Sequence, residues 1–169
     1  IELNAAECLI DTIPSAEMVK FAKNGSNVTT AAIKLARSFT KRNYIAIPRQ
    51  HPFFSFDDWF ISTTPLKRGT VNNASQYTLL FDYGNIESLK SLFKQYPDQI
   101  AAVMLEPATT EIPLPNKYPP LSSKPITQSS VIPEDNFLLS IERLCKKNGS
   151  IFILDEMITG FRWHLKGAS

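Results

Sequence analysis

The 169-residue chain lacks most of the residue patterns that identify metal, disulfide or hydrolytic proteins. Its two cysteines, Cys8 and Cys145, each lie in a helix-like apolar pattern, with no second Cys or His at the spacing of a metal site. We therefore expect two buried free thiols, as in a reducing cytoplasm. The only histidines are His51 and His164, and no Ser or Cys has the local features of a nucleophile, so a hydrolase or a zinc site has little support.

A strong charge of one sign and a long apolar run are missing as well. The formal net charge is +2, from 18 Lys+Arg against 16 Asp+Glu, which gives no reason to expect a nucleic acid or an anionic lipid as partner. No apolar run has the length of a membrane span, and the first residues resemble no signal peptide, so we expect a cytoplasmic protein with no membrane association. The absence of an initial Met suggests that the chain begins within a longer protein.

Segments of helical and of extended pattern alternate along the chain. Helices are expected over 5–12, 29–39, 86–96 and 134–147, a short extended run over 18–22, and apolar strands over 44–47, 77–81, 100–105 and 151–154. This alternation predicts an α/β fold with a mostly parallel sheet and helices on both of its faces. Between Pro107 and Pro133 lie seven of the 12 prolines, which indicates an extended surface excursion within one domain.

In such a sheet, ligands bind beyond the carboxyl ends of the strands, and three places there carry candidate chemistry. The first is Asn24-Gly25-Ser26, directly before a predicted helix. Glycine lets the backbone approach a ligand, and the free amides of a first helical turn favour a phosphate. An ordinary helix cap explains the same tripeptide, and from these residues alone it is favoured by roughly three to one.

The second place is Asp155, which follows the apolar run 151–154. A carboxylate at the end of a strand can hold a cationic ring nitrogen, a metal or a helix start. Asp155-Glu156 also resembles the acidic motif of nucleotide-hydrolysing folds, but the chain has no glycine-rich loop with Gly-Lys-Ser/Thr to accompany it.

The third place is the aromatic cluster over 51–59, His-Pro-Phe-Phe-Ser-Phe-Asp-Asp-Trp. Aromatic side chains this dense after a strand can stack on a flat ligand, or they can belong to the core or to a subunit contact. The cluster alone does not decide between these roles.

Taken in order, these segments resemble the class III aminotransferases that depend on pyridoxal 5'-phosphate (PLP), and especially the glutamate-1-semialdehyde aminomutases. Residues 23–37 are similar to the family's Asn-Ser-Gly-Thr-Glu-Ala helix start, and 101–107 match its Ala-Ala-Val-Ile-Val-Glu-Pro strand. The segment 153–162, Ile-Leu-Asp-Glu-Met-Ile-Thr-Gly-Phe-Arg, is the most specific match. The matches are collinear over almost the whole chain.

The resemblance implies a fold-type I PLP-dependent transferase large domain, of which residues 1–169 form an incomplete part. It implies that Gly25 and Ser26 hold the cofactor phosphate, that Phe53 stacks on the pyridine ring, and that Met157 contacts the ring from the other side. It implies that Asp155 is the catalytic residue and contacts the pyridine ring nitrogen. It also places Glu106 among the cofactor-binding residues. Four residues depart from the family's pattern: Asn27, Phe54, Ser55 and Met157.

The resemblance also implies a homodimeric enzyme that transfers an amino group between small molecules, as a transaminase or an aminomutase. The family's N-terminal segment, its Schiff-base lysine segment and its small C-terminal domain are not in the 169 residues, and Lys166 does not match that lysine. The chain alone is therefore expected to be inactive. Two alternatives stay open: a non-catalytic remnant that acts as a binding or interaction module, and a Rossmann-like domain that binds a nucleotide or a sugar.

Overall fold

The computed structural model describes residues 1–50, 53–108, 136–162 and 164–167. Most of the predicted excursion over 107–133 lies outside these residues. The described part is an α/β fold, as the sequence predicts, and its elements follow one another in the order α1 (Glu2–Thr12), α2 (Gly25–Thr40), β1 (Tyr44–Pro48), α3 (Asp58–Ile61), β2 (Thr78–Phe81), α4 (Ile86–Gln95), β3 (Ile100–Leu105), α5 (Phe137–Asn148) and β4 (Ile151–Leu154).

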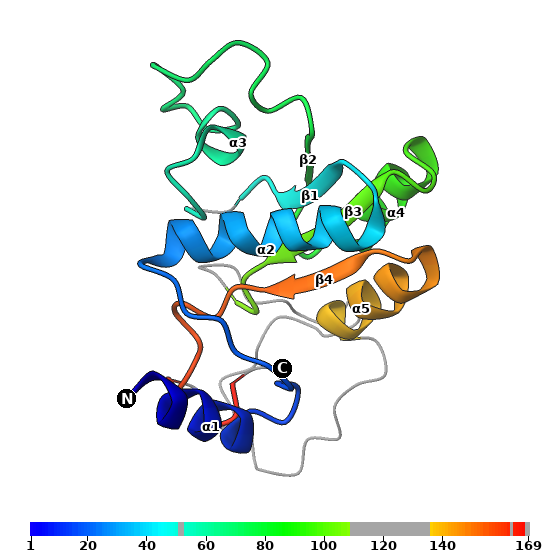
Figure 1. The fold of residues 1–169 in the computed structure, drawn as a ribbon. Coiled ribbons are helices and arrows are strands. Elements are labelled where there is room, and N and C mark those ends of the chain that lie inside the picture. The colour runs from blue at the N-terminus through cyan, green and yellow to red at the C-terminus, as the bar shows by residue number, and fades with distance from the viewer. Residues whose placement is uncertain (51–52, 109–135, 163, 168–169) are drawn as a thin grey trace, which may run out of the picture.

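The four strands form one parallel sheet in the order β2-β1-β3-β4 (Figure 1). β3 is buried along its whole length, which explains why its sequence is continuously apolar instead of alternating. At the end of the sheet, Leu105 of β3 pairs with Leu154 of β4. The residues that follow these two strands therefore leave the sheet side by side.

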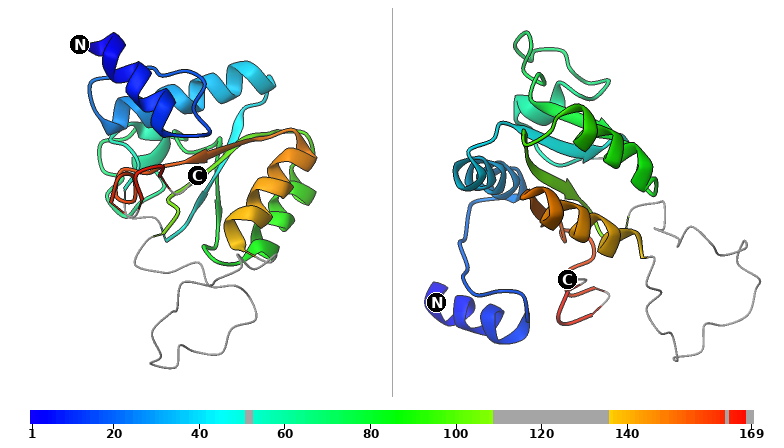
Figure 2. Two further views of the ribbon diagram at one scale, coloured as in Figure 1. Left: turned by 90° about the horizontal axis from the view of Figure 1, so that it is seen from below. Right: turned by 90° about the vertical axis from the view of Figure 1, so that its right-hand side faces the viewer.

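Helices cover both faces of the sheet, and each face has its own apolar cluster (Figure 2). On one face, Ile33 and Ala36 of α2 pack on Ile45, Ile47, Ala102 and Met104. On the other face, α4 and α5 pack on Ala46, Val103 and Leu105. Side chains alternate between the two faces along β1 and from Ala102 to Leu105 of β3, as the pleat of a strand requires.

α1 lies apart from the sheet (Figures 1 and 2) and has no buried residue. The prediction of two buried thiols is therefore wrong for Cys8, which is exposed on α1, and right for Cys145, which is buried on α5. Burial raises the pKa of the Cys145 thiol to about 12. Residues 18–22 belong to no strand, and no helix of the described residues is long and apolar enough to cross a membrane.

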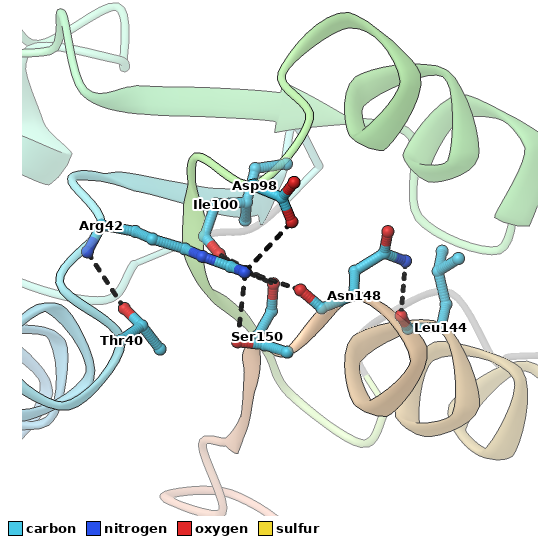
Figure 3. Close-up of polar contacts among 8 residues, drawn as sticks. Thr40, Arg42, Asp98, Ile100, Leu144, Asn148 and Ser150 are labelled. Carbon is cyan, nitrogen blue, oxygen red and sulfur yellow. Dashed lines mark hydrogen bonds and ion pairs between the residues drawn. The ribbon is translucent and has the colours of Figure 1, made fainter.

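At the amino ends of the strands, the guanidinium group of Arg42 joins several segments (Figure 3). Its Nη1 donates to the carbonyl oxygens of Asn148 at 2.6 Å, Gly149 at 3.1 Å and Ile100 at 3.2 Å. Its Nη2 lies 3.3 Å from the carboxylate of Asp98. One side chain thus connects the segments that precede β1, β3 and β4.

Candidate functional site

A cleft of about 1080 Å³ opens at the carboxyl end of the sheet, the end opposite Arg42. Its walls come from the start of α2, the segment 53–57 and the ends of β3 and β4. The lining residues are Asn24, Gly25, Ser26, Asn27, Val28, Thr29, Ala32, Phe53, Phe54, Phe56, Asp57, Met104, Glu106, Ile153, Leu154, Asp155, Glu156, Met157 and Ile158. The cleft is thus at the place where open parallel sheets bind their ligands.

The start of α2 presents backbone amides to this cleft. Asn24 is the N-cap, and its Oδ1 accepts a hydrogen bond from the amide of Asn27 at 3.1 Å. The amide of Val28 donates to the carbonyl oxygen of Asn24 at 3.1 Å. Among the amides of this first turn, those of Gly25 and Ser26 are then the donors that a ligand can use, at the positive end of the helix dipole.

Hydroxyl groups of α2 fix the segment 53–57 against the helix. The Thr29 hydroxyl donates to the carbonyl oxygen of Phe54 at 3.0 Å, and the amide of Phe56 donates to Oγ of Ser26 at 3.2 Å. The hydroxyl of the next residue, Thr30, donates to the carboxylate of Asp57. Because Oγ of Ser26 already accepts a hydrogen bond, its own hydroxyl proton can be donated into the cleft.

Three aromatic residues of this segment line the cleft, Phe53, Phe54 and Phe56. The rings of Phe53 and Phe56 meet edge to face with centroids 4.9 Å apart, and Phe53 makes a similar contact with Phe60 at 5.8 Å. Phe53 and Phe56 are both exposed, whereas Phe54 is buried in the core below them. Phe53 is therefore accessible from the cleft although it also packs against Phe60.

Two carboxyl groups stand at the sheet end of the cleft. Glu106 follows β3 and Asp155 follows β4, on the same face of the sheet as Met104 and Ile153. The Asp155 amide donates to the carbonyl oxygen of Leu105 at 3.0 Å, which continues the pairing of the two strands by one residue. Glu106 and Asp155 therefore lie side by side because of the register of β3 and β4 and because side chains alternate along each strand.

Burial affects the ionisation of both groups. Burial raises the pKa of Asp155, and the Met157 amide, which donates to Oδ1 of Asp155 at 3.0 Å, lowers it by a smaller amount. Burial also raises the pKa of Glu106 to about 7, and the charge of Asp155 adds to this increase. A cation placed between the two carboxyl groups would relieve the cost of ionising them.

Met157 connects the two ends of the cleft. A Cβ atom added to Gly25 would lie 3.1 Å from the Cε atom of Met157, so the methionine side chain reaches from the end of β4 to the start of α2. A larger side chain at position 25 would therefore require a small shift of the methionine methyl group.

All the residues singled out from the sequence line this cleft: Gly25, Ser26, Phe53, Glu106, Asp155 and Met157. Their individual roles stay predictions. Sequence reasoning did not identify Phe56 as a lining residue, although the aromatic cluster contained the signal, and it missed the hydroxyl contacts of Thr29 and Thr30. Asn24 is the helix cap that was weighed as an alternative, and this cap lies among the residues that line the cleft.

The remaining candidates lie elsewhere. His51 is outside the described residues, and His164 is exposed, where its Nδ1 accepts from the amide of Lys166 at 3.1 Å. Lys166 is exposed in the same turn and does not line the cleft. The residues that the structure describes contain no group of three or more His, Cys, Asp or Glu that could hold a metal ion.

Comparison with known proteins agrees with the resemblance seen in the sequence. No protein-family model matches the chain. A glutamate-1-semialdehyde 2,1-aminomutase from Wigglesworthia glossinidia brevipalpis is 33% identical over 99% of this chain and 37% of its own length. The chain thus spans little more than a third of this curated relative.

Solved structures share the fold. An omega-transaminase from Sphaerobacter thermophilus matches 98% of this chain and 37% of its own, with a TM-score of 0.74 and 24% identity. The FumI protein of Sphingopyxis sp. MTA144, in a form carrying PLP, matches 96% of this chain and 35% of its own, with a TM-score of 0.74 and 23% identity. The chain therefore has the α/β fold of the fold-type I PLP-dependent transaminases and is similar in sequence, along nearly all its length, to glutamate-1-semialdehyde 2,1-aminomutases.

Proposed function

We propose that this chain forms the PLP-binding part of an enzyme that transfers an amino group, as a transaminase or as an aminomutase. The observation that carries the proposal is the shared cleft: the start of α2, with Gly25 and Ser26, and the tip of β4, with Asp155, open onto the same space. The names of the relatives, an aminomutase and an omega-transaminase, support the same reaction class.

The residues of the cleft fit a phosphorylated, cationic ring. At the start of α2, the amides of Gly25 and Ser26 and the Ser26 hydroxyl are suitable donors for a phosphate, and the helix dipole adds to the attraction. At the other end of the cleft, the buried carboxyl group of Asp155 is suited to hold a protonated ring nitrogen. The two ends of the cleft therefore carry charges opposite in sign to those of the PLP phosphate and ring nitrogen.

When bound, PLP supplies an electron-accepting ring for the electrons of a bond broken next to the substrate nitrogen. Asp155 has the task of keeping the proton on the ring nitrogen, because its carboxylate stabilises the positive charge there. Phe53 and Met157 have the task of fixing the plane of the ring from opposite sides. Glu106, beside Asp155, adds a second carboxyl group that favours a cation at this end.

The proposal also covers the substrates, the assembly and the location of the protein. The substrates are small-molecule amino donors and acceptors, the longer protein is a homodimer, and the protein works in the cytoplasm. Sedimentation velocity of the longer protein would test the dimer directly. A monomer with full transaminase activity would contradict this part of the proposal while leaving the assignment of the cleft intact.

Titration of the chain with PLP, followed by absorbance, tests the cofactor site. We expect saturable binding by the unchanged chain and an affinity at least about 10-fold lower for Asp155→Asn, because a charge-assisted hydrogen bond to the ring nitrogen is lost. Asp82→Asn is the matched control, since Asp82 directly follows β2 as Asp155 follows β4 but does not line the cleft. Absence of saturable binding, or an equal loss with Asp82→Asn, would overturn the proposal.

Activity in the longer protein separates an enzyme from a non-catalytic binding module. We expect Asp155→Ala to abolish amino transfer there while circular dichroism shows an unchanged fold. An unchanged longer protein that binds PLP but turns over no amino donor would favour the binding module instead.

A further inference from the structure

The three methionines of the chain differ sharply in their exposure. Met104 is fully buried in β3, whereas Met18 and Met157 are 88% and 69% exposed. Of the two exposed methionines, only Met157 lines the cleft, and its methyl group lies against Gly25 at the start of α2. An accessible thioether thus stands beside the amides that face the cleft.

We propose that Met157 is a site of reversible oxidation by peroxides, and that its sulfoxide weakens ligand binding at the start of α2. The second part of this inference rests on the proposed PLP function. The first part, the reactivity of Met157 toward peroxide, rests on its exposure, which it shares with Met18.

The reaction balances with hydrogen peroxide as the oxidant. A lone pair of the Met157 sulfur attacks one peroxide oxygen, the O–O bond breaks and an S–O bond forms. The proton of the transferred oxygen passes to the departing hydroxide, which leaves as water. The sulfur loses two electrons and the peroxide gains them.

The product changes the wall of the cleft in two ways. The thioether is apolar and flexible, whereas the sulfoxide carries an oxygen that accepts hydrogen bonds strongly. The Met157 side chain ends near Gly25, so this oxygen would compete with an incoming phosphate for the amides of Gly25 and Ser26. The added oxygen also takes up space on the side of the cleft that faces Gly25.

The chain supplies its own controls. Met18 has the same chemistry and a greater exposure, yet it does not line the cleft, so its oxidation should not affect binding. Met104 should resist oxidation because peroxide cannot reach it in the folded chain. Cys8 is exposed and would also react, so all proteins in the test carry Cys8→Ser, whereas Cys145 is buried.

The experiment treats this chain and its Met157→Leu variant with hydrogen peroxide, maps the added oxygen by peptide mass spectrometry, and titrates PLP before and after treatment. We expect Met18 and Met157 to gain one oxygen each and Met104 none. On treatment, the PLP affinity of the chain that keeps Met157 should fall about fivefold or more. The PLP affinity of Met157→Leu should be the same before and after treatment, because leucine has a similar volume and cannot be oxidised. Methionine sulfoxide reductase should restore the affinity.

The possible failures are distinguishable. If the untreated chain does not bind PLP, the proposed function and the effect on binding both fall. If it binds PLP but Met157 resists peroxide, or if oxidised Met157 leaves the affinity unchanged, this inference is overturned and the proposed function stands. An equal loss of affinity in Met157→Leu would overturn it as well, because the damage would then lie elsewhere.

Discussion

The two carboxyl groups at the ends of β3 and β4 are costly to the folded chain when both are ionised. Glu106 is only 6% exposed, and its pKa is raised from 4.5 to about 7, first by burial and then by the charge of Asp155. An enzyme that uses this end of the cleft for a cation gains from such an arrangement, because ligand binding relieves the repulsion between the carboxylates. The cost of ionising both groups would thus favour a cation at this end of the cleft.

This arrangement predicts a specific pH dependence of stability. Between pH 4.5 and about 7, the folded chain keeps a proton on Glu106 that the unfolded chain has already lost. The free energy of unfolding should therefore decrease as the pH rises through this window. We expect Glu106→Gln, which cannot ionise, to remove the part of the decrease that Glu106 causes and to be more stable than the unchanged chain at pH 8 by about 1 to 3 kcal/mol.

Urea unfolding at several pH values between 4 and 8 measures this difference. Glu87→Gln is the control, because Glu87 lies at the exposed start of α4 and pairs with Lys90 at 2.7 Å. The control should follow the unchanged chain at every pH. Parallel stability curves for Glu106→Gln and the unchanged chain would show that Glu106 ionises as it does in the unfolded state.

At the scale of whole elements, two helices begin in the same way but serve different ends. Asn24 caps α2 and Asn85 caps α4, and each side chain accepts hydrogen bonds from amides of the first turn. The start of α2 faces the cleft, whereas Asn85 and the first turn of α4 are not among the lining residues. A comparison of these two caps can therefore separate the contribution of a cap to stability from its contribution to a binding site.

We expect Asn24→Ala and Asn85→Ala each to lower the free energy of unfolding by about 1 kcal/mol, the usual cost of a lost cap. Only Asn24→Ala should also weaken PLP binding, because the first turn that carries the amides of Gly25 and Ser26 then loses its fixed geometry. Thermal unfolding and PLP titration of both variants provide the test. Equal PLP affinities in the two variants would contradict the role given to the start of α2.

The elements that the sequence predicted are those whose pattern is set locally. The strands were predictable because each is an apolar run with clear limits, and Gly149 ends α5 in the left-handed conformation expected there, with φ 63°. α2 was predicted to begin at residue 29 because Gly25, Ser26 and Asn27 are poor helix formers, yet the cap at Asn24 extends the helix to Gly25. The four-residue helix α3 was missed because one turn has no periodicity to detect.

The exposure of Cys8 could not be predicted from its pattern. Amphipathic spacing shows that a helix has an apolar face, but not which neighbour covers it. In the described residues, nothing buries a residue of α1. The content of the cleft was predictable for a different reason: in a parallel sheet, residues that follow the strands meet at one edge. The contact of Met157 with Gly25 depends on side-chain packing between distant segments, which no local pattern encodes.

At the scale of the whole molecule, the two ends of the sheet carry different features. The carboxyl end carries the cleft and its two costly carboxyl groups, while the amino end is held by the Arg42 guanidinium group (Figure 3). Arg42 contacts segments more than 100 residues away along the chain, at Asn148 and Gly149. The contacts of Arg42 and the two carboxyl groups thus lie at opposite ends of the sheet.

We expect Arg42→Ala to lower the free energy of unfolding by about 2 to 4 kcal/mol, because it removes several charge-assisted hydrogen bonds, among them the partly buried bond to the carbonyl oxygen of Asn148. Arg42→Lys should recover only part of this loss, since an ammonium group lacks the planar fork that reaches several carbonyl oxygens at once. Arg49→Ala is the control: its pair with Asp82 at 3.5 Å is exposed, and such pairs contribute at most about 1 kcal/mol. PLP affinity should be unchanged in the folded fraction of Arg42→Ala, because the cleft lies at the opposite end of the sheet. A loss no larger than that of Arg49→Ala in urea unfolding would show that the sheet does not depend on this contact.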